Sequence, residues 1–246
     1  MKATFQPLGD QAVVVQFGST MSLEAYQQVR RVALILENNP IPGMVEYIPA
    51  YTTITIFYNP QELYDWYQKH VGKEREEELD SLYQVICNLI REQLNQATIE
   101  STGVERTIEI PVCYGGELGP DLPDVAALNR LTEQEVIDIH VGGDYLVYMI
   151  GFAPGFPYIG GMSEQIAAPR RKSPRLSIPA GSVGIAGKQT GIYPMETPGG
   201  WQIIGRTPVR LFRPEDDPPS LLQAGDRVRF YPISMEEYRA FEEGSS

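Results

Sequence analysis

The chain has 246 residues, of which 42% are hydrophobic and 21% are charged, so it can build one large or two small globular cores and is not intrinsically disordered. Its formal net charge of −12 disfavours unspecific binding to nucleic acid or to an anionic membrane, because both require a positive field. No apolar run approaches the ~18 residues of a membrane span, and two cysteines cannot form a disulfide scaffold. These features predict a soluble cytoplasmic protein that binds neither nucleic acid nor membrane.

The first hundred residues predict an α+β unit in which helices cover one face of a small sheet. Runs of β-branched residues are typical of strands, and apolar residues spaced by three and four are typical of amphipathic helices. On these grounds we expect strands at Asp10–Phe17, Val45–Ala50 and Thr52–Tyr58, and helices from Ser22 to Asn39, over Gln61–His70 and from Leu79 to about Ala97.

A change of composition at Glu100–Gly103 predicts a linker, which divides the chain into two domains, 1–100 and 104–246. In the second domain, short strands alternate with glycine and proline between Asp144 and Tyr231, a pattern that favours a closed or nearly closed β-barrel. We also expect a strand at Thr107–Val112, two short helices between Leu122 and His140, and a terminal helix at Ser234–Phe241. The second of the short helices has a capping box formed by Thr132 and Glu135.

Positive charge is concentrated in one part of the second domain. The stretch from Gly151 to Arg213 contains eight basic and two acidic residues, a net charge of +6, which leaves −18 for the rest of the chain. A basic island rich in glycine and proline indicates shaped loops that face an anion or an acidic partner. The alternative is a set of tight turns whose charges are simply solvated.

Three motifs in this island could carry chemistry. Pro169–Arg175 (PRRKSPR) places four cations among prolines, where guanidinium groups can pair with phosphate or carboxylate oxygens. Gly151–Gly161 (GFAPGFPYIGG) could form a rigid aromatic wall, and Ile178–Gly200 interleaves glycines with donors that could bind an oxyanion. Each motif also has a structural interpretation, as an exposed loop, a barrel corner or a set of turns.

Signatures of the common enzyme classes are absent from the sequence. There is no dinucleotide-binding or phosphate-binding glycine motif and no hydrolase elbow. With His70 and His140 as the only histidines, a zinc site built by this chain is not expected. His140 could act as a general base or an orienting group, whereas no local signature supports a nucleophilic pair of Cys113 and His140.

Taken together, the motifs resemble the carboxyltransferase C/D-subdomain family, which includes the B subunit of 5-oxoprolinase, allophanate hydrolase subunit 1 and the sporulation kinase inhibitor KipI. The resemblance covers nearly the whole chain. The segments that carry it are His140–Gly142, Gly151–Gly161, Pro169–Arg175, Ile178–Tyr193 and Thr197–Pro208 (TPGGWQIIGRTP).

The resemblance implies a ferredoxin-like N-terminal domain followed by a cyclophilin-like barrel. It further implies one member of a complex that, with the homologous C subunit and the A subunit, opens 5-oxo-L-proline to L-glutamate at the expense of ATP, bound with Mg²⁺ in the assembled complex. The chain alone is expected to be inactive, and no metal site of its own is expected. The alternatives are a KipI-like inhibitor that binds a sensor histidine kinase, and a protein of the allophanate hydrolase or urea-carboxylation type.

Opening a lactam through an activated amide requires cations and donors that stabilise charge developing on oxygen. The expected catalytic residues are His140, Arg170, Arg175, Lys188 and Arg206. The expected substrate-binding residues are Ser182, Gln189, Thr190 and Tyr193, which would orient the substrate, and Phe152, Phe156, Tyr158 and Trp201, which would form the walls.

Overall fold

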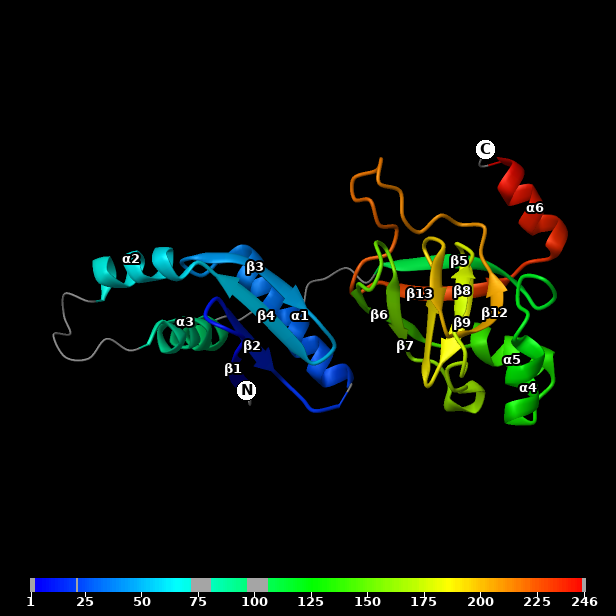
Figure 1. Ribbon diagram of the computed structural model, residues 1–246, viewed down its shortest axis with the longest axis horizontal. Coiled ribbons are helices and arrows are strands. Elements are labelled where there is room, and N and C mark those ends of the chain that lie inside the picture. Colours follow the sequence, from blue (N-terminus) through cyan, green and yellow to red (C-terminus); the bar gives the residue numbers. More distant parts are fainter. Residues whose placement is uncertain (1–2, 21, 72–80, 97–105, 245–246) are drawn as a thin grey trace. The chain divides into compact units, whose positions relative to one another are not determined.

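The computed structural model describes residues 3–20, 22–71, 81–96 and 106–244. The chain divides into two compact units, Met1–Gly103 and Val104–Ser246 (Figure 1), and each unit has a hydrophobic core of its own. The linker expected at Glu100–Gly103 and the expected helix start at Leu79 lie outside the described residues. No described helix is long and apolar enough to cross a membrane.

The first unit is an antiparallel sheet of four strands in the order β1-β2-β4-β3. The predicted α+β character is confirmed, although β1 is a strand that the sequence patterns did not predict. The elements are β1 (Thr4–Pro7), β2 (Ala12–Gln16), α1 (Leu23–Asn38), β3 (Met44–Pro49), β4 (Thr53–Tyr58), α2 (Pro60–His70) and α3 (Leu82–Gln96).

Local signals explain where these helices begin and which face they bury. The backbone N–H of Ala25 donates to the Ser22 hydroxyl, 3.1 Å away, so Ser22 caps α1 as predicted. In β4, Ile54 and Ile56 are fully buried against the helices, whereas the alternate residues are half-buried. One side of the sheet therefore shares a single core with α1, α2 and α3.

The second unit contains a closed barrel of seven strands in the order β10-β7-β6-β13-β5-β12-β9, which confirms the predicted barrel. Only the pair of β5 and β13 is parallel among the barrel's strand pairs in the described residues. The barrel strands are β5 (Thr107–Tyr114), β6 (Tyr145–Ile150), β7 (Pro157–Gly160), β9 (Ser182–Ala186), β10 (Gln189–Ile192), β12 (Gln202–Arg206) and β13 (Arg227–Pro232).

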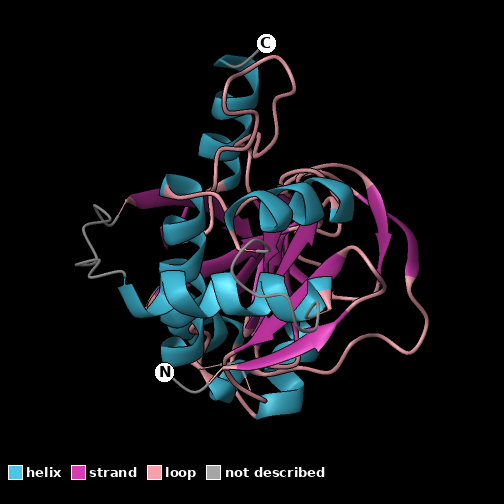
Figure 2. Cartoon of the chain, turned by 90° about the vertical axis from the view of Figure 1, so that its left-hand side faces the viewer, coloured by secondary structure: helices cyan, strands magenta, loops and turns pink. Residues whose placement is uncertain are grey.

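A small two-stranded sheet and several helices accompany the barrel. β8 (Arg175–Ile178) pairs with β11 (Thr197–Gly199). The helices are α4 (Leu122–Asn129), α5 (Glu133–Val141), a short 3-10 turn η1 (Glu164–Ile166) and α6 (Met235–Gly244), which ends the described chain (Figure 2). The predicted capping box of α5 is present: Thr132 accepts from the N–H of Glu135, whose carboxylate accepts from the N–H of Thr132.

The barrel interior holds a polar network around His140, which is completely buried. The Thr190 hydroxyl donates to the carbonyl of Gly184, 3.2 Å away, so its oxygen accepts from Nε2 of His140, 2.9 Å away. Nδ1 of the ring is then an acceptor, and the Tyr114 hydroxyl, at 2.8 Å, donates to it. His140 is thus a neutral imidazole with both nitrogens satisfied.

Burial lowers the pKa of His140 from 6.5 to about 3, because an imidazolium in this apolar interior would lose its hydration. The Tyr145 and Phe230 rings lie against the imidazole, with centroids 5.4 and 4.6 Å away. Between these two pH values the unfolded chain binds a proton that the folded barrel rejects. The stability that neutral His140 contributes is therefore complete above pH ~6.5 and is lost as the pH falls toward 3.

We expect His140→Gln to flatten the pH dependence of the barrel's unfolding free energy by up to about 1.4 kcal/mol per pH unit between pH 6 and 4. Glutamine keeps a donor and an acceptor but cannot titrate. Urea titrations followed by Trp201 fluorescence, in a Trp66→Phe background, measure this slope. His70→Gln is the control, because His70 is exposed, and equal slopes in both variants would contradict the prediction.

Candidate functional site

Arg170 and five of the aromatic residues predicted from the sequence line one pocket of the second unit, with a volume of about 390 Å³. We call it the aromatic pocket. It is lined by Phe152, Phe156, Tyr158, Arg170, Pro174, Tyr193, Pro198, Gly199, Gly200 and Trp201.

Phe156 is the centre of the aromatic pocket's wall. Its ring packs edge-to-face against four others, with centroids 5.3 Å from Phe152, 5.2 Å from Tyr158, 5.5 Å from Tyr193 and 5.8 Å from Trp201. Phe156 itself is only 2% exposed. The wall is therefore a rigid cluster assembled where three barrel strands, β7, β10 and β12, begin or end.

Phe152 combines two features that are rare for an aromatic residue. Its φ is +72°, in the left-handed region that favours glycine, and its side chain is 68% exposed. A strained backbone that displays an apolar ring to solvent is a feature of binding sites. The strain places the ring at the mouth of the aromatic pocket.

The position of Tyr193 in this wall depends on a close backbone approach at Gly199. A Cβ at this position would lie 2.5 Å from the Tyr193 hydroxyl oxygen, so only glycine allows the strand to pass the ring. Burial raises the pKa of Tyr193, against a smaller opposite effect of the Trp201 backbone N–H and of the nearby arginines. Tyr193 is therefore protonated at neutral pH and can donate a hydrogen bond.

Arg170 supplies the positive charge of the aromatic pocket. It is exposed and lines the pocket, and it makes no ion pair or hydrogen bond with the described part of the chain. Its neighbours in sequence are fixed: Gln202 Nε2 donates to the carbonyl of Pro169 at 3.0 Å, and the N–H of Arg171 donates to the carbonyl of Gly200 at 2.7 Å. A cation on a held loop is suited to bind a ligand's carboxylate.

Arg175 lies behind the pocket wall and its charge is already paired. Its two Nη atoms donate to the two carboxylate oxygens of Asp121, at 2.8 and 2.7 Å, and these hydrogen bonds raise its pKa. Arg171 donates to the same carboxylate at 2.8 Å. Asp121 did not emerge from the sequence, where it is one acidic residue in a loop. The signal that could have found it is the need of two inward-facing arginines for a buried counter-ion.

The other expected site residues do not line the aromatic pocket. His140 and Thr190 belong to the barrel interior, and Ser182 is also fully buried. Lys188 is exposed on the turn between β9 and β10, where it pairs with Glu164 at 2.6 Å. Gln189 and Arg206 are half-buried on β10 and β12. Of the four cations expected to be catalytic, only Arg170 lines the aromatic pocket, whereas Arg175 is paired with Asp121.

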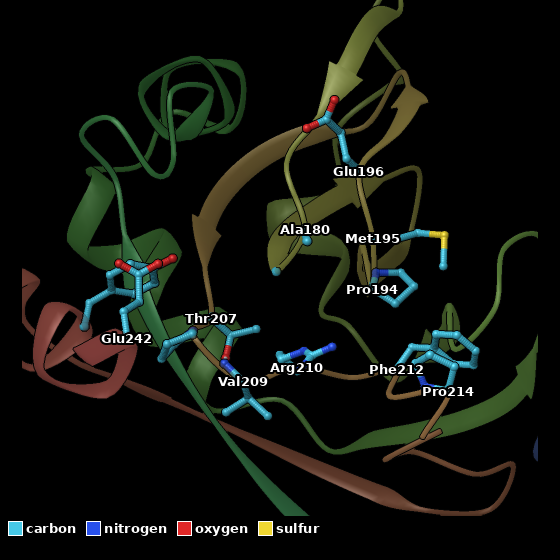
Figure 3. A pocket seen from close by; sticks show the side chains of 13 residues that line it. Ala180, Pro194, Met195, Glu196, Thr207, Val209, Arg210, Phe212, Pro214 and Glu242 are labelled. Atoms are coloured by element: carbon cyan, nitrogen blue, oxygen red, sulfur yellow. The ribbon is translucent and has the colours of Figure 1, made fainter. Parts of the chain in front are cut away.

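A second hollow, of about 550 Å³, lies beside α6 and contains none of the residues predicted for the site. Figure 3 shows Glu196 at the top of it and Glu242 at the left, with Thr207, Val209 and Arg210 along its lower edge. Arg210 is paired with Glu215 at 3.4 Å. This hollow lacks an unpaired cation and an aromatic cluster, so the aromatic pocket is the better candidate for ligand binding.

Comparisons with known proteins show which family the chain belongs to. The chain is 50% identical to the B subunit of 5-oxoprolinase from Bacillus subtilis (strain 168), over 98% of this chain and 97% of the relative. It is 43% identical to the B subunit of 5-oxoprolinase from Escherichia coli O157:H7, over 92% and 94%. The crystal structure of TTHA0988 is similar with a TM-score of 0.73 and 33% identity, and it covers 91% of this chain, which spans 40% of that structure. The family model of the carboxyltransferase domain, subdomain C and D, matches residues 3–222, and the chain belongs to this family, as its motifs predicted.

Proposed function

We propose that the chain is one subunit of an ATP-dependent 5-oxoprolinase, and that it works with partner A and C subunits to open 5-oxo-L-proline to L-glutamate. Support comes from two relatives, both named as B subunits of 5-oxoprolinase, that match nearly the whole chain. The observation that carries the assignment to a site is the aromatic pocket with one unpaired cation.

The substrate's chemistry matches the aromatic pocket. 5-Oxoproline is a nearly flat five-membered lactam with a single carboxylate. In our proposal Arg170 binds the carboxylate, and the rings of Phe152, Phe156 and Trp201 cover the faces of the lactam. Tyr193 then donates to the lactam carbonyl oxygen, where negative charge develops when the C–N bond is attacked.

The reaction adds one water molecule across the lactam C–N bond, which yields the free amine and a second carboxylate of glutamate. A lactam is a poor electrophile, and ATP hydrolysis supplies the driving force in the proposed complex. The contribution of this chain is to bind and orient the ring and to polarise its carbonyl group.

The hollows lined by arginine in the described residues do not fit a triphosphate. The three arginines that line another hollow, of about 600 Å³, are each engaged in an ion pair: Arg106 with Asp226, Arg210 with Glu215 and Arg213 with Asp216. No group of His, Cys, Asp or Glu in the described residues is arranged to hold a metal ion. We therefore assign ATP and Mg²⁺ to the assembled complex and derive no step through them.

The proposal also covers the domain boundaries, the fold type of each domain and the cellular location. We propose domains at 1–100 and 104–246, a ferredoxin-like first domain, a cyclophilin-like barrel and a cytoplasmic location. In the first unit β2, α1 and β3 form a crossover with β4 inserted between the two strands, as in ferredoxin-like folds. The edge strand beside β2, however, is β1, which precedes the crossover along the chain instead of following it.

We expect the purified chain to release no glutamate from 5-oxoproline, and the mixture with the A and C subunits and ATP to release it. The physical reason is that, in our proposal, the aromatic pocket binds the ring, whereas the arginines that line the hollow of about 600 Å³ are already engaged in ion pairs. Glutamate release by the isolated chain would contradict the proposal. No release by the full mixture would favour the kinase-inhibitor alternative, which inhibition of a sensor histidine kinase's autophosphorylation would test.

We expect Arg170→Ala to raise the KM for 5-oxoproline in the assembled complex about 10- to 100-fold, because a hydrogen bond to a charged group contributes about 1.5–3 kcal/mol. Arg170→Lys should recover part of the loss, since it restores the charge without the planar fork. Lys188→Ala is the matched control: it removes an exposed cation outside the pocket. Equal effects of Arg170→Ala and Lys188→Ala would place the substrate elsewhere.

We expect Phe152→Gly to stabilise the barrel by about 1 kcal/mol, because glycine adopts the positive φ without strain, and at the same time to weaken substrate binding. Thermal unfolding and the KM for 5-oxoproline measure the two effects. Phe152→Leu keeps the strain and loses the ring, so it should weaken binding without raising stability. A gain of stability with unchanged KM in Phe152→Gly would show that the exposed ring has no part in binding.

A further inference from the structure

Asp121 connects two separate segments of the second unit, Pro169–Arg175 and β12, through one buried carboxylate. Its side chain is 3% exposed. It accepts from both Nη atoms of Arg175 and from Nη1 of Arg171, and Oδ2 also accepts from the N–H of Ile203 at 2.6 Å. The N–H of Asp121 donates in turn to the carbonyl of Ile203 at 2.9 Å, so the residue is locked to β12 by main chain and side chain.

These segments are the ones that form one side of the aromatic pocket. Arg171 follows Arg170 directly, and Arg175 follows Pro174, which also lines the pocket. Arg175 is also the pairing partner of Gly199 across β8 and β11, while Ile203 lies two residues beyond Trp201. Asp121 itself does not line the pocket. It therefore contacts residues next to those that line the pocket without lining the pocket itself.

We propose that Asp121 is the positioning residue of the aromatic pocket: its carboxylate holds the Arg170-bearing loop against the wall formed by Gly199, Gly200 and Trp201. The inference rests on the proposed function only for its effect on 5-oxoproline turnover. Its effect on the wall itself holds for any ligand.

Charge explains why one carboxylate can control the loop. Arg171 and Arg175 are partly buried, with side chains 34% and 25% exposed, and they share a single counter-ion. The Nε of Arg171 is buried without a hydrogen-bond partner in the described residues, so Asp121 provides the hydrogen bond that holds this guanidinium. Without the negative charge, two neighbouring cations would repel each other and Arg170. The loop would then move away from the wall, and Arg170 would leave the position from which it reaches a carboxylate.

The same unit offers a closely matched control. Asp226 is another buried carboxylate, 6% exposed, that accepts from Nε and Nη2 of Arg106 at 2.9 and 2.5 Å and from the N–H of Gln223 at 2.7 Å. Neither Asp226 nor Arg106 lines the aromatic pocket. Asp226→Asn therefore removes a bidentate arginine pair of the same kind without touching the proposed site.

The experiment compares Asp121→Asn with Asp226→Asn in two assays. In the assembled complex, Asp121→Asn should raise the KM for 5-oxoproline about tenfold while kcat changes less than threefold, and Asp226→Asn should keep KM within twofold. In the isolated chain with Trp66→Phe, acrylamide should quench Trp201 at least twofold more efficiently in Asp121→Asn than in Asp226→Asn. Both variants should show a similar loss in Tm, which reports the structural cost common to the two.

Equal quenching and equal KM in the two variants would overturn the proposal and leave Asp121 a purely structural residue. If Asp121→Asn does not fold, Arg175→Lys against Arg106→Lys makes the same comparison, because lysine keeps the charge and loses the bidentate pair. Failure of the proposed function is seen separately: the unsubstituted complex would not turn over 5-oxoproline, while the quenching assay would still decide the role of Asp121.

Discussion

The parallel pairing of β5 with β13 is the constraint on which the second unit depends. Six residues of β5, from Thr107 to Val112, pair with Arg227 to Pro232, so the first and last strands of the barrel are neighbours. At the start of the ladder, the backbone N–H of Arg227 donates to the carbonyl of Arg106, and the Arg106 side chain is paired with Asp226. The chain between β5 and β13 is therefore fixed at both of its ends by this pairing, and the loops of the aromatic pocket belong to this part of the chain. A rigid frame with variable loops is the usual arrangement for a binding site.

Two buried polar clusters serve this frame in different ways. The network of His140, Thr190 and Tyr114 lies inside the barrel and is neutral, with each ring nitrogen satisfied. The cluster of Asp121 with Arg171 and Arg175 is charged and lies behind the pocket wall. A neutral, satisfied network adds specificity to a core, whereas a shared carboxylate couples the positions of the loops that contact it. In this chain, therefore, His140 stabilises the barrel core, and in our proposal Asp121 positions the residues of the aromatic pocket.

Much of the fold could be predicted from the sequence because its signals are local. Ser22 and Thr132 cap their helices, and the barrel was foreseen from short strands between glycines and prolines. The aromatic part of the pocket was also foreseen, since Phe152, Phe156 and Tyr158 lie close together in one motif. The roles of the charged residues were not, because a cation's partner is set by tertiary contacts. Arg175 meets Asp121 across 54 positions of sequence, and Lys188 meets Glu164 across 24. The burial of His140 could not be predicted for the same reason, because the residues near it along the chain do not indicate a completely buried ring.

The direction of β13 has a consequence for how the polypeptide is threaded. Because β5 and β13 run the same way over six paired residues, the chain enters the barrel at one end and leaves it at the other, where α6 begins at Met235. At ~3.3 Å per residue the two ends are separated by about 20 Å. A circular permutant that joins the end of α6 to the start of β5 would thus need a connection long enough to run the full height of the barrel, unlike the short joints that suffice in folds with adjacent termini.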